Sequence, residues 1–290
     1  MDMVKNYVSL DNNEKKLVYK FITRREEEKK TIMEIEKDIK IDTYNYGKGV
    51  LFYFEDGGVL GKVSVVLEVA EVMHVAYIHN IDILEGIDNK EKVLKELIEK
   101  GSLIAKEYSA TKILLGIRNN EVLKVAEAIE LYSEYSSFIM ILEERKSKAE
   151  ILDIVPISAE ILNEYVDNYN SSFMDMPHGT YIDLKEAKGY LEKVDENNEF
   201  FLVKADGITI GFMNVSIENN EGFFDIGLRK EYRKQGYGKM LLETAIDFLK
   251  KKDTEKICLI VIEKNSVAYE MYKKRGFKVY SKISNWIQIE

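Results

Sequence analysis

The spacing of apolar residues changes abruptly on either side of residue 236. Residues 223–229 form a dense apolar run of β-forming side chains, whereas from Lys239 onward the apolar positions recur at helical spacing. Between the two runs stands R-K-Q-G-Y-G-K, residues 233–239. Glycines at such a junction favour a tight loop, so the pattern predicts a strand, a glycine loop and a helix in succession.

The same order of patterns occurs twice along the chain. The first half predicts a helix capped by Asp11, a helix at 25–39, a hairpin of strands 50–54 and 59–67, a strand at 72–83, a helix at 90–107, a strand at 112–117, a helix at 121–132 and a strand at 136–142. The second half predicts helices at 158–169 and 183–194, a hairpin of strands 200–204 and 208–217, the strand–loop–helix unit, a strand at 256–263, a helix bearing Tyr272 and a strand at 278–289. Asp183 and Glu186 form a predicted capping box. We infer an α/β protein made by tandem duplication, with domains at 1–145 and 151–290 and the polar residues 143–150 as linker.

Composition narrows the class of protein. The chain has 290 residues, of which 46% are apolar and 32% charged, enough for two compact domains. No apolar run approaches the roughly 20 residues that cross a bilayer, and the N-terminus lacks a signal-peptide core, so we expect a cytoplasmic protein without a membrane segment. The single cysteine, Cys258, excludes an internal disulfide and is expected to pack in a strand. A net charge of −9 without an extended basic face argues against nucleic acid as a partner.

The glycine loop opposes this global charge. Five residues between Arg229 and Lys239 are basic and one is acidic. A helix start offers unpaired backbone N–H groups and the positive end of a dipole, and glycine lets an anion approach the backbone closely. The loop is therefore a candidate phosphate cradle, although a glycine-relaxed turn with solvated lysines explains the same residues. It lacks the third glycine and the acidic residue of a dinucleotide site, and it is not a nucleotide P-loop.

The loop and the segment after it resemble the GNAT superfamily of acyl-CoA-dependent N-acyltransferases over residues 151–290. The resemblance rests on R-x-x-G-x-G and, after the next strand, on Asn265-x-x-Ala268-x-x-x-Tyr272-x-x-x-Gly276-Phe277. It implies two GNAT-like domains, each a central, mostly antiparallel twisted sheet flanked by helices, and acetyl-CoA as co-substrate. The expected cofactor contacts are Arg233, Lys234, Gln235, Gly236, Tyr237, Gly238 and Lys239 at the pyrophosphate, Ile226, Gly227 and Leu228 on a splayed strand beside the pantetheine arm, and Asn265 and Ala268.

Transfer of an acyl group from a thioester to an amine needs a neutral nucleophile, a stabilised oxyanion and a proton for the leaving thiolate. The resemblance assigns the general acid to Tyr272, and a phenol titrating near about 10 suits a thiol titrating near about 8.5. The alternative is an aromatic packed on the sheet, as expected for Tyr269. Asp225 is a candidate base, acting directly or through water, and the alternative is a solvated strand-edge carboxylate.

The acceptor is expected to contact the irregular segment 170–181. Phe173 and Tyr181 are expected in an apolar wall, Asp175 is a candidate partner for an ammonium group, and His178 is a second candidate base. Helix-to-helix packing is an equally simple account of this segment. His74 and His79 share one predicted strand without partners at ligand spacing, so no metal site is expected.

A shift of 144 residues superimposes 112–115 on 256–259, and it puts Lys92 and Leu94 where the second copy has Gly236 and Gly238. Side chains at these positions block close approach of a pyrophosphate. We therefore expect the first copy to keep the fold without the cofactor site and to act structurally, by packing on the second copy or shaping the acceptor cleft. Divergent binding of acyl-CoA is the alternative.

The sequence thus predicts an acetyl-CoA-dependent N-acetyltransferase with a small-molecule primary amine as acceptor. Two alternatives remain open. One is a protein acetyltransferase acting on a lysine or an N-terminal amine, and the other is a non-catalytic acyl-CoA-binding regulatory module.

Overall fold

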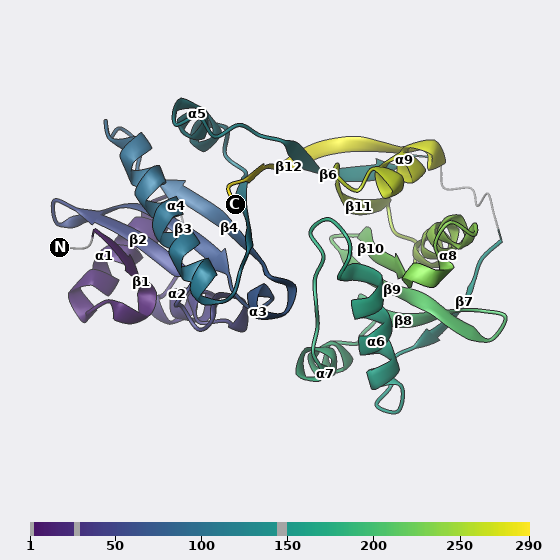
Figure 1. The fold of residues 1–290 in the computed structure, drawn as a ribbon. Coiled ribbons are helices and arrows are strands. Elements are labelled where there is room, and N and C mark those ends of the chain that lie inside the picture. The colour runs from purple at the N-terminus through teal and green to yellow at the C-terminus, as the bar shows by residue number, and fades with distance from the viewer. Residues whose placement is uncertain (1–2, 26–29, 144–149) are drawn as a thin grey trace. The chain divides into compact units, whose positions relative to one another are not determined.

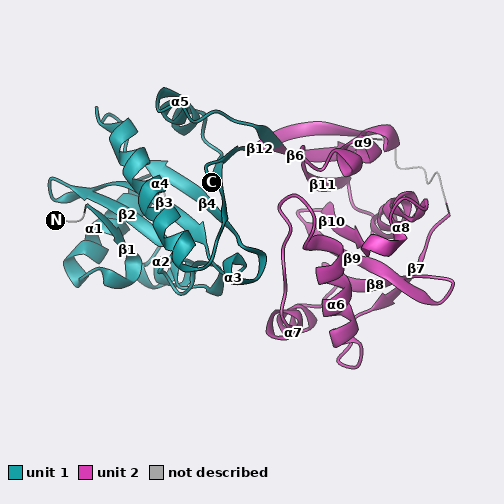
Figure 2. Ribbon diagram, in the orientation of Figure 1, with its two compact units in different colours: residues 1–136, 284–290 teal, residues 137–283 magenta. Residues whose placement is uncertain are grey.

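The computed structural model describes residues 3–25, 30–143 and 150–290, which form two compact units. Unit 1 comprises residues 1–136 and 284–290, and unit 2 comprises residues 137–283 (Figure 2). Each unit has a mixed sheet with helices on both faces, as predicted (Figure 1). Most of the predicted linker, residues 144–149, lies outside the described residues.

Unit 1 follows the predicted order of elements closely. Its elements are β1 (Val4–Asn6), α1 (Asn12–Ile22), α2 (Ile32–Ile39), β2 (Val50–Glu55), β3 (Gly58–Val66), α3 (Ala70–Met73), β4 (Val75–Ile83), α4 (Lys90–Glu107), β5 (Lys112–Ile117) and α5 (Asn120–Ala128). Asp11 caps α1 in a capping box with Glu14. The strand expected from residue 72 begins later because α3 occupies its first residues, and β1 was not predicted. The strands run in the order β1-β2-β3-β4-β5, and only β4 and β5 are parallel among these pairs.

Unit 2 repeats this plan. Its elements are β6 (Tyr135–Leu142), β7 (Asp153–Pro156), α6 (Leu162–Phe173), α7 (Leu184–Glu192), β8 (Asn198–Ala205), β9 (Ile208–Glu218), β10 (Glu221–Leu228), α8 (Tyr237–Lys251), β11 (Lys256–Ile262), α9 (Ser266–Arg275) and β12 (Phe277–Gln288). Asp183 caps α7 as expected, while the Glu186 carboxylate accepts a hydrogen bond from the Tyr190 hydroxyl. One face of the sheet packs against α6 and α7 and the other against α8.

The last strand of each sequence half does not stay with its own half. β6 pairs antiparallel with β11 in unit 2, where Met140 and Leu142 are buried in the core. The end of β12 pairs with β5 in unit 1, from Asn285 opposite Ile117 to Gln288 opposite Leu114. The compact units therefore differ from the expected division at residues 145 and 151, because backbone pairing joins segments that are distant in sequence.

The corresponding helices α4 and α8 begin at different positions when the two units are aligned in sequence. With the shift of 144 residues, α8, which begins at Tyr237, would begin at Val93 in unit 1. α4 instead begins at Lys90. The first unit therefore has helix where the second has the glycine loop.

A buried ion pair fixes α9 against α8. Arg275 and Glu243 are both buried, and the guanidinium donates hydrogen bonds to the carboxylate. Only an arrangement of the two helices that keeps this pair together avoids an uncompensated buried charge. The pair therefore favours one position of α9 against α8. The helix that carries Tyr272 is thereby held beside the helix that follows the glycine loop.

Candidate functional site

The two parallel strands of unit 2 separate halfway along their length. β10 pairs with β11 from Glu221 opposite Lys256 to Phe223 opposite Cys258, and beyond this point β10 pairs only with β9 while β11 pairs with β6. This is the splay that the sequence led us to expect around residues 226–228. It leaves one edge of β10 outside the sheet's own hydrogen bonding, and an extended ligand can pair with a free strand edge.

The glycine loop lies directly after the separated part of β10. Gly236 has φ +95° and Lys234 has φ +62°, a backbone conformation that glycine adopts without strain. α8 begins immediately afterwards, and no side chain of the described residues caps it. Its first N–H groups and the positive end of its dipole therefore face outward, as an anion site requires.

Gly238 has a different role from Gly236. A Cβ atom at Gly238 would lie 3.6 Å from Met271 Sδ and 3.9 Å from Leu228 Cδ1, which are ordinary contacts, and its φ is not positive. Neither backbone strain nor packing within the protein therefore requires glycine here. Its missing side chain instead keeps open the gap between the end of β10 and α9.

Arg233 ties the loop to unit 2. Its Nε donates to Leu228 O at 3.0 Å, one terminal nitrogen donates to Ser172 O at 3.0 Å, and the guanidinium binds the Asp175 carboxylate bidentately at 2.7 and 2.8 Å. The pKa of Asp175 is lowered, chiefly by these hydrogen bonds. The guanidinium expected at the pyrophosphate and the carboxylate expected at an ammonium group are thus paired with each other.

The other residues that we expected to contact the cofactor differ in their exposure to solvent. Lys234, Gln235 and Lys239 are exposed, and Gln235 also donates to Glu231 O. Tyr237 is half-buried against Tyr232. Ile226 and Leu228 pack on the α8 side of the sheet, and Gly227 is required by packing, because a Cβ there would lie 2.5 Å from the Phe212 ring.

The start of α9 closes the site from the β11 side. The Asn265 side chain caps α9 by accepting a hydrogen bond from the N–H of Ala268. The two residues expected to contact the cofactor are therefore joined to each other at a helix start. Asn265 is half-buried and leaves its amide nitrogen as a donor.

Tyr272 lies on α9 and is 8% exposed. Its ring contacts Phe277 edge-on, with 5.9 Å between ring centroids. Burial raises the pKa of the phenol, and the negative charge of Asp225 raises it further. Tyr272 is therefore protonated at any physiological pH and can serve only as a proton or hydrogen-bond donor.

Asp225 lies on the separated part of β10, opposite Asn214 of β9. Its side chain reaches solvent, yet the surrounding protein removes enough water to raise the pKa of the carboxyl. Within the described part of the chain it has no ion-pair or hydrogen-bond partner to offset this. A desolvated carboxylate without a partner is a candidate functional group rather than a stabilising one.

A polar pair beside Asp225 was missed in the sequence. The Tyr165 hydroxyl of α6 donates to Asn214 Oδ1 at 2.7 Å, and both belong to the face of the sheet that carries Asp225. The pairing joins residues 49 positions apart, and only the cross-strand register brings them together, so no local motif reveals it.

The segment expected to contact the acceptor is anchored at both ends. Asn170 holds Ile182 through two hydrogen bonds of 2.9 Å, which close the loop between α6 and α7. Phe173 packs in an aromatic cluster with Tyr169 and Phe212. His178 has φ +56° and is half-buried, as is Tyr181. Phe173 therefore belongs to the core under the loop, and His178 and Tyr181 to the loop itself.

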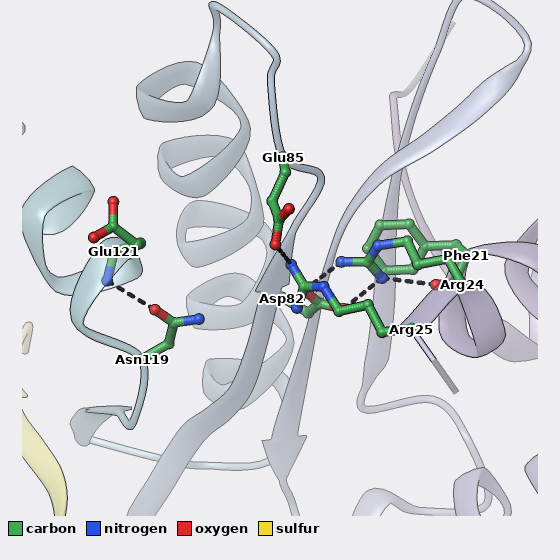
Figure 3. A network of polar contacts seen from close by, with 7 residues as sticks. All are labelled: Phe21, Arg24, Arg25, Asp82, Glu85, Asn119 and Glu121. Atoms are coloured by element: carbon green, nitrogen blue, oxygen red, sulfur yellow. Dashed lines mark hydrogen bonds and ion pairs between the residues drawn. The ribbon is translucent and has the colours of Figure 1, made fainter. Parts of the chain in front are cut away.

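Charged side chains occupy the position in unit 1 that corresponds to the glycine loop and the separated strands of unit 2. A cavity of about 410 Å³ lies beside the starts of α4 and α5, and its charged lining residues are four carboxylates and three cations: Asp82, Glu85, Glu91, Glu121, Arg25, Lys90 and Lys124. Arg24 binds Asp82 bidentately at 2.6 and 2.7 Å, and Arg25 binds Glu85 at 2.6 Å (Figure 3). Ion-paired side chains thus occupy the region where unit 2 leaves its strand edge and helix start open.

The described residues contain no group of three or more His, Cys, Asp or Glu side chains placed to hold a metal ion. The same part of the chain contains no helix long and apolar enough to span a membrane.

Solved structures share this fold over nearly the whole chain. A GCN5-related N-acetyltransferase from Sphaerobacter thermophilus superimposes with a TM-score of 0.61 at 11% identity, covering 99% of this chain and 96% of that one. A tandem GNAT protein from the clavulanic acid biosynthesis pathway gives a TM-score of 0.54 at 10% identity, covering 99% and 98%. At these identities the likeness concerns the fold alone.

Curated relatives match shorter stretches. An uncharacterised N-acetyltransferase from Methanocaldococcus jannaschii is 24% identical over 144 residues, 46% of this chain and 63% of the relative. The spermidine N(1)-acetyltransferase of Thermoplasma acidophilum is 38% identical over 76 residues, 26% of this chain and 47% of the relative. A putative [ribosomal protein bS18]-alanine N-acetyltransferase from Bacillus subtilis is 29% identical over 80 residues, 27% of this chain and 53% of the relative. The chain thus spans about half to under two thirds of the length of these relatives.

One family model matches in the region that carries the site. Residues 159–277, from before α6 to the start of β12, match the acetyltransferase (GNAT) family. The match includes the glycine loop, the separated strands and Tyr272. Residues 159–277 of this chain therefore form a domain of the acetyltransferase (GNAT) family.

Proposed function

We propose that the protein is an acetyl-CoA-dependent N-acetyltransferase whose active site lies in unit 2. The observation that carries the proposal is the coincidence of two features, the separation of β10 from β11 after Phe223 and the uncapped start of α8 directly beyond it. A strand edge suits an extended amide-bearing arm, and a helix start suits a diphosphate. Coenzyme A contains both groups in that order.

The backbone would do most of the binding. The N–H groups at Gly236, Tyr237 and Gly238 are proposed to bind the diphosphate, with Lys234 and Lys239 adding positive charge. The edge of Ile226, Gly227 and Leu228 is proposed to pair with the pantetheine arm. Because Arg233 is bound to Asp175, its proposed role is to hold the loop in shape.

Tyr272 is proposed to donate the proton that the departing thiolate needs. Its raised pKa guarantees that the phenol carries a proton, and it keeps the phenol a weaker acid than the thiol. Tyr272 is therefore proposed to donate a hydrogen bond to the sulfur as charge develops on it and to pass the proton on as the thiolate leaves, rather than to give the proton up in advance.

Asp225 is proposed as the base that removes a proton from the attacking amine, directly or through water. The carboxyl has a raised pKa and no partner in the described chain, so an ammonium group or a bound water can approach it without breaking an ion pair. The hydroxyl and amide of the Tyr165–Asn214 pair stand beside it as further polar contacts for an acceptor.

A small-molecule primary amine is the preferred acceptor, with Tyr181 and His178 of the loop as further contacts. The relative named as a spermidine acetyltransferase is the more identical of the two relatives with a named acceptor. A protein N-terminus is the second candidate, because the other relative is named for alanine of a ribosomal protein. An unpaired carboxylate at the site favours a cationic acceptor in both cases.

Unit 1 is proposed to bind no coenzyme A. In place of the two glycines, α4 has side chains at Lys92 and Leu94, which would block close approach of a diphosphate to the backbone. Three of the four carboxylates that line the adjoining cavity, those of Asp82, Glu85 and Glu121, are in ion pairs, so the basic side chains there are already engaged.

The activity is tested by incubating the full chain with acetyl-CoA and a panel of amines while free thiol is measured. We expect thiol release with spermidine or a related polyamine, and mass spectrometry should find one acetyl group on the amine. Release of thiol only with a peptide that has an N-terminal alanine would favour the protein acetyltransferase. Tight binding of coenzyme A without release for any amine would favour the non-catalytic module.

Gly238→Ala tests the binding site. The added Cβ points into the gap between Leu228 and Met271, so we expect the dissociation constant for coenzyme A to rise by about tenfold or more, an effect of about 1.4 kcal/mol. The thermal midpoint should not fall, because the position is unstrained and alanine is favoured over glycine in a helix. Gly189→Ala on α7, where no atom lies within 4 Å of the added Cβ, serves as control for the same change in a helix. Calorimetry should give one site per chain, and a second site that survives Gly238→Ala would contradict the assignment to unit 2.

Tyr272→Phe tests the general acid. It removes one hydroxyl and keeps the ring packed on Phe277, so the fold and the affinity for coenzyme A should be retained. Turnover should fall by about 100-fold or more, within the range for loss of a positioned proton donor. Tyr269→Phe, on the same helix, is the matched control and should leave turnover unchanged. Equal turnover of the two variants would reject the role of Tyr272.

Asp225→Asn separates function from stability. The unfolded carboxyl titrates near 3.8 and the folded one higher, so between these values the folded state binds more protons and stability falls as pH rises. At neutral pH the variant should therefore unfold at a higher temperature than the parent, by a few degrees, and this gain should vanish below the ordinary pKa. Turnover should drop. Asp206→Asn, in the β8–β9 turn, should change neither the thermal midpoint nor turnover. An unchanged turnover of Asp225→Asn would contradict the proposed role of Asp225 as the base.

A further inference from the structure

The first hairpin of unit 1 aligns with the first hairpin of unit 2 when 150 is added to its residue numbers. Asp56 and Gly57 correspond to Asp206 and Gly207, and all four have φ between 51° and 77°. The sheet irregularity between Tyr53 and Phe54 corresponds to the one between Val203 and Lys204. This equivalence puts Lys62 of β3 at the position of Phe212 in β9.

The two positions are packed in opposite ways. Phe212 is fully buried and has the rings of Tyr169 and Phe173 at 4.6 and 5.0 Å between centroids. At Lys62, by contrast, unit 1 has a cavity of about 350 Å³ beneath α1 and α2. We call this cavity the Lys62 pocket. Unit 1 thus has a cavity at the position where unit 2 has a packed aromatic core.

The walls of the Lys62 pocket are aliphatic. Ile22 of α1, Ile35 and Ile39 of α2, and Val50 of β2 line it together with Ile41. The polar lining residues are Tyr44, Ser64 and Asn80, the ion-paired Lys30 and Asp38, and Lys62 itself. An apolar body with a few convergent polar groups is the usual composition of a small-molecule site, and the volume is at the lower end of the range.

Lys62 is half-buried and is the charged group of this pocket that has no protein partner among the described residues. No residue of the described ranges lies within hydrogen-bond or ion-pair distance of its ammonium, and burial lowers its pKa. The charged groups that face it are already engaged. Asp82 is bound by Arg24 at 2.6 Å, and Asp38 is bound by Lys30 at 2.8 Å.

The neighbouring polar groups are neutral and ordered. The Tyr44 hydroxyl accepts a hydrogen bond from Asn80 Nδ2 at 3.1 Å and lies 3.3 Å from His79 Nε2. Burial lowers the pKa of His79 to about 4, so the ring is uncharged at neutral pH. Lys62 is therefore the single cationic group of this pocket whose partner is missing among the described residues, with hydroxyl groups beside it.

We propose that the Lys62 pocket binds a small aliphatic monocarboxylate, with the carboxylate on the Lys62 ammonium and the hydrocarbon body against the isoleucines. A desolvated ammonium is stabilised most by an anion that brings its own charge and hydrogen-bond acceptors. The second cation that lines the pocket, Lys30, is bound by Asp38, so Lys62 alone is available to an anion, which suits a single carboxylate better than a phosphate. The pocket is also too small for coenzyme A.

The probe is isovalerate, titrated into the full chain by calorimetry, with isovaleramide as the uncharged analogue that has the same carbon skeleton. We expect isovalerate to bind with one site per chain and isovaleramide to bind at least tenfold more weakly. Lys62→Met, which keeps the length of the side chain, should abolish binding. Lys48→Met removes an exposed lysine of the same unit and should leave binding unchanged.

A second measurement distinguishes a direct contact from a structural effect. Binding of a carboxylate stabilises the charged form of Lys62, so above the lowered pKa the complex should take up a proton. The heat of binding should then depend on the ionisation enthalpy of the buffer for the parent and Lys48→Met. Failure of isovalerate to bind the parent, equal binding of isovaleramide, or unchanged binding to Lys62→Met would each overturn the proposal.

Discussion

The separation of two parallel strands is the constraint on which the rest of unit 2 depends. β10 and β11 are paired over only three residues, so one edge of β10 remains available from Phe224 onward. Everything proposed for this unit is arranged about that edge. The glycine loop follows its end, Asp225 lies on it, and α9 approaches it from the other strand with Tyr272. A fully paired sheet would leave no backbone groups of β10 for an extended ligand.

The loop after β10 is held in shape by groups that a simple motif reading would assign to the ligand. Arg233 uses its guanidinium on Leu228 O, Ser172 O and Asp175, which fixes the loop against α6. Anion binding is left to backbone N–H groups and the helix dipole, which need no side-chain ordering. The buried Arg275–Glu243 pair does the equivalent for α9. These two ion pairs therefore act by positioning the backbone.

Unit 1 shows how one fold supports a different use of the same places. Its parallel strands pair from Val75 opposite Lys112 to Ile78 opposite Leu115, and beyond them Asp82 and Glu85 are bound by two arginines. On the opposite side of the hairpin, Lys62 replaces an aromatic core residue and a cavity appears. Unit 1 thus has an ion-pair network at one of these positions and a cavity at the other.

Local patterns in the sequence determined the order of elements, because hydrophobic periodicity, caps and glycines act within a few residues. α4 and β5 have the bounds that periodicity predicts, and Asp11 and Asp183 cap their helices. The glycine loop and Tyr272 were likewise visible as a spaced motif. Tertiary structure alone decided which strands pair across the two halves, that Arg233 binds Asp175, and that Tyr165 and Lys62 stand where they do. These depend on register and packing between segments tens of residues apart, for which no short stretch of sequence holds the information.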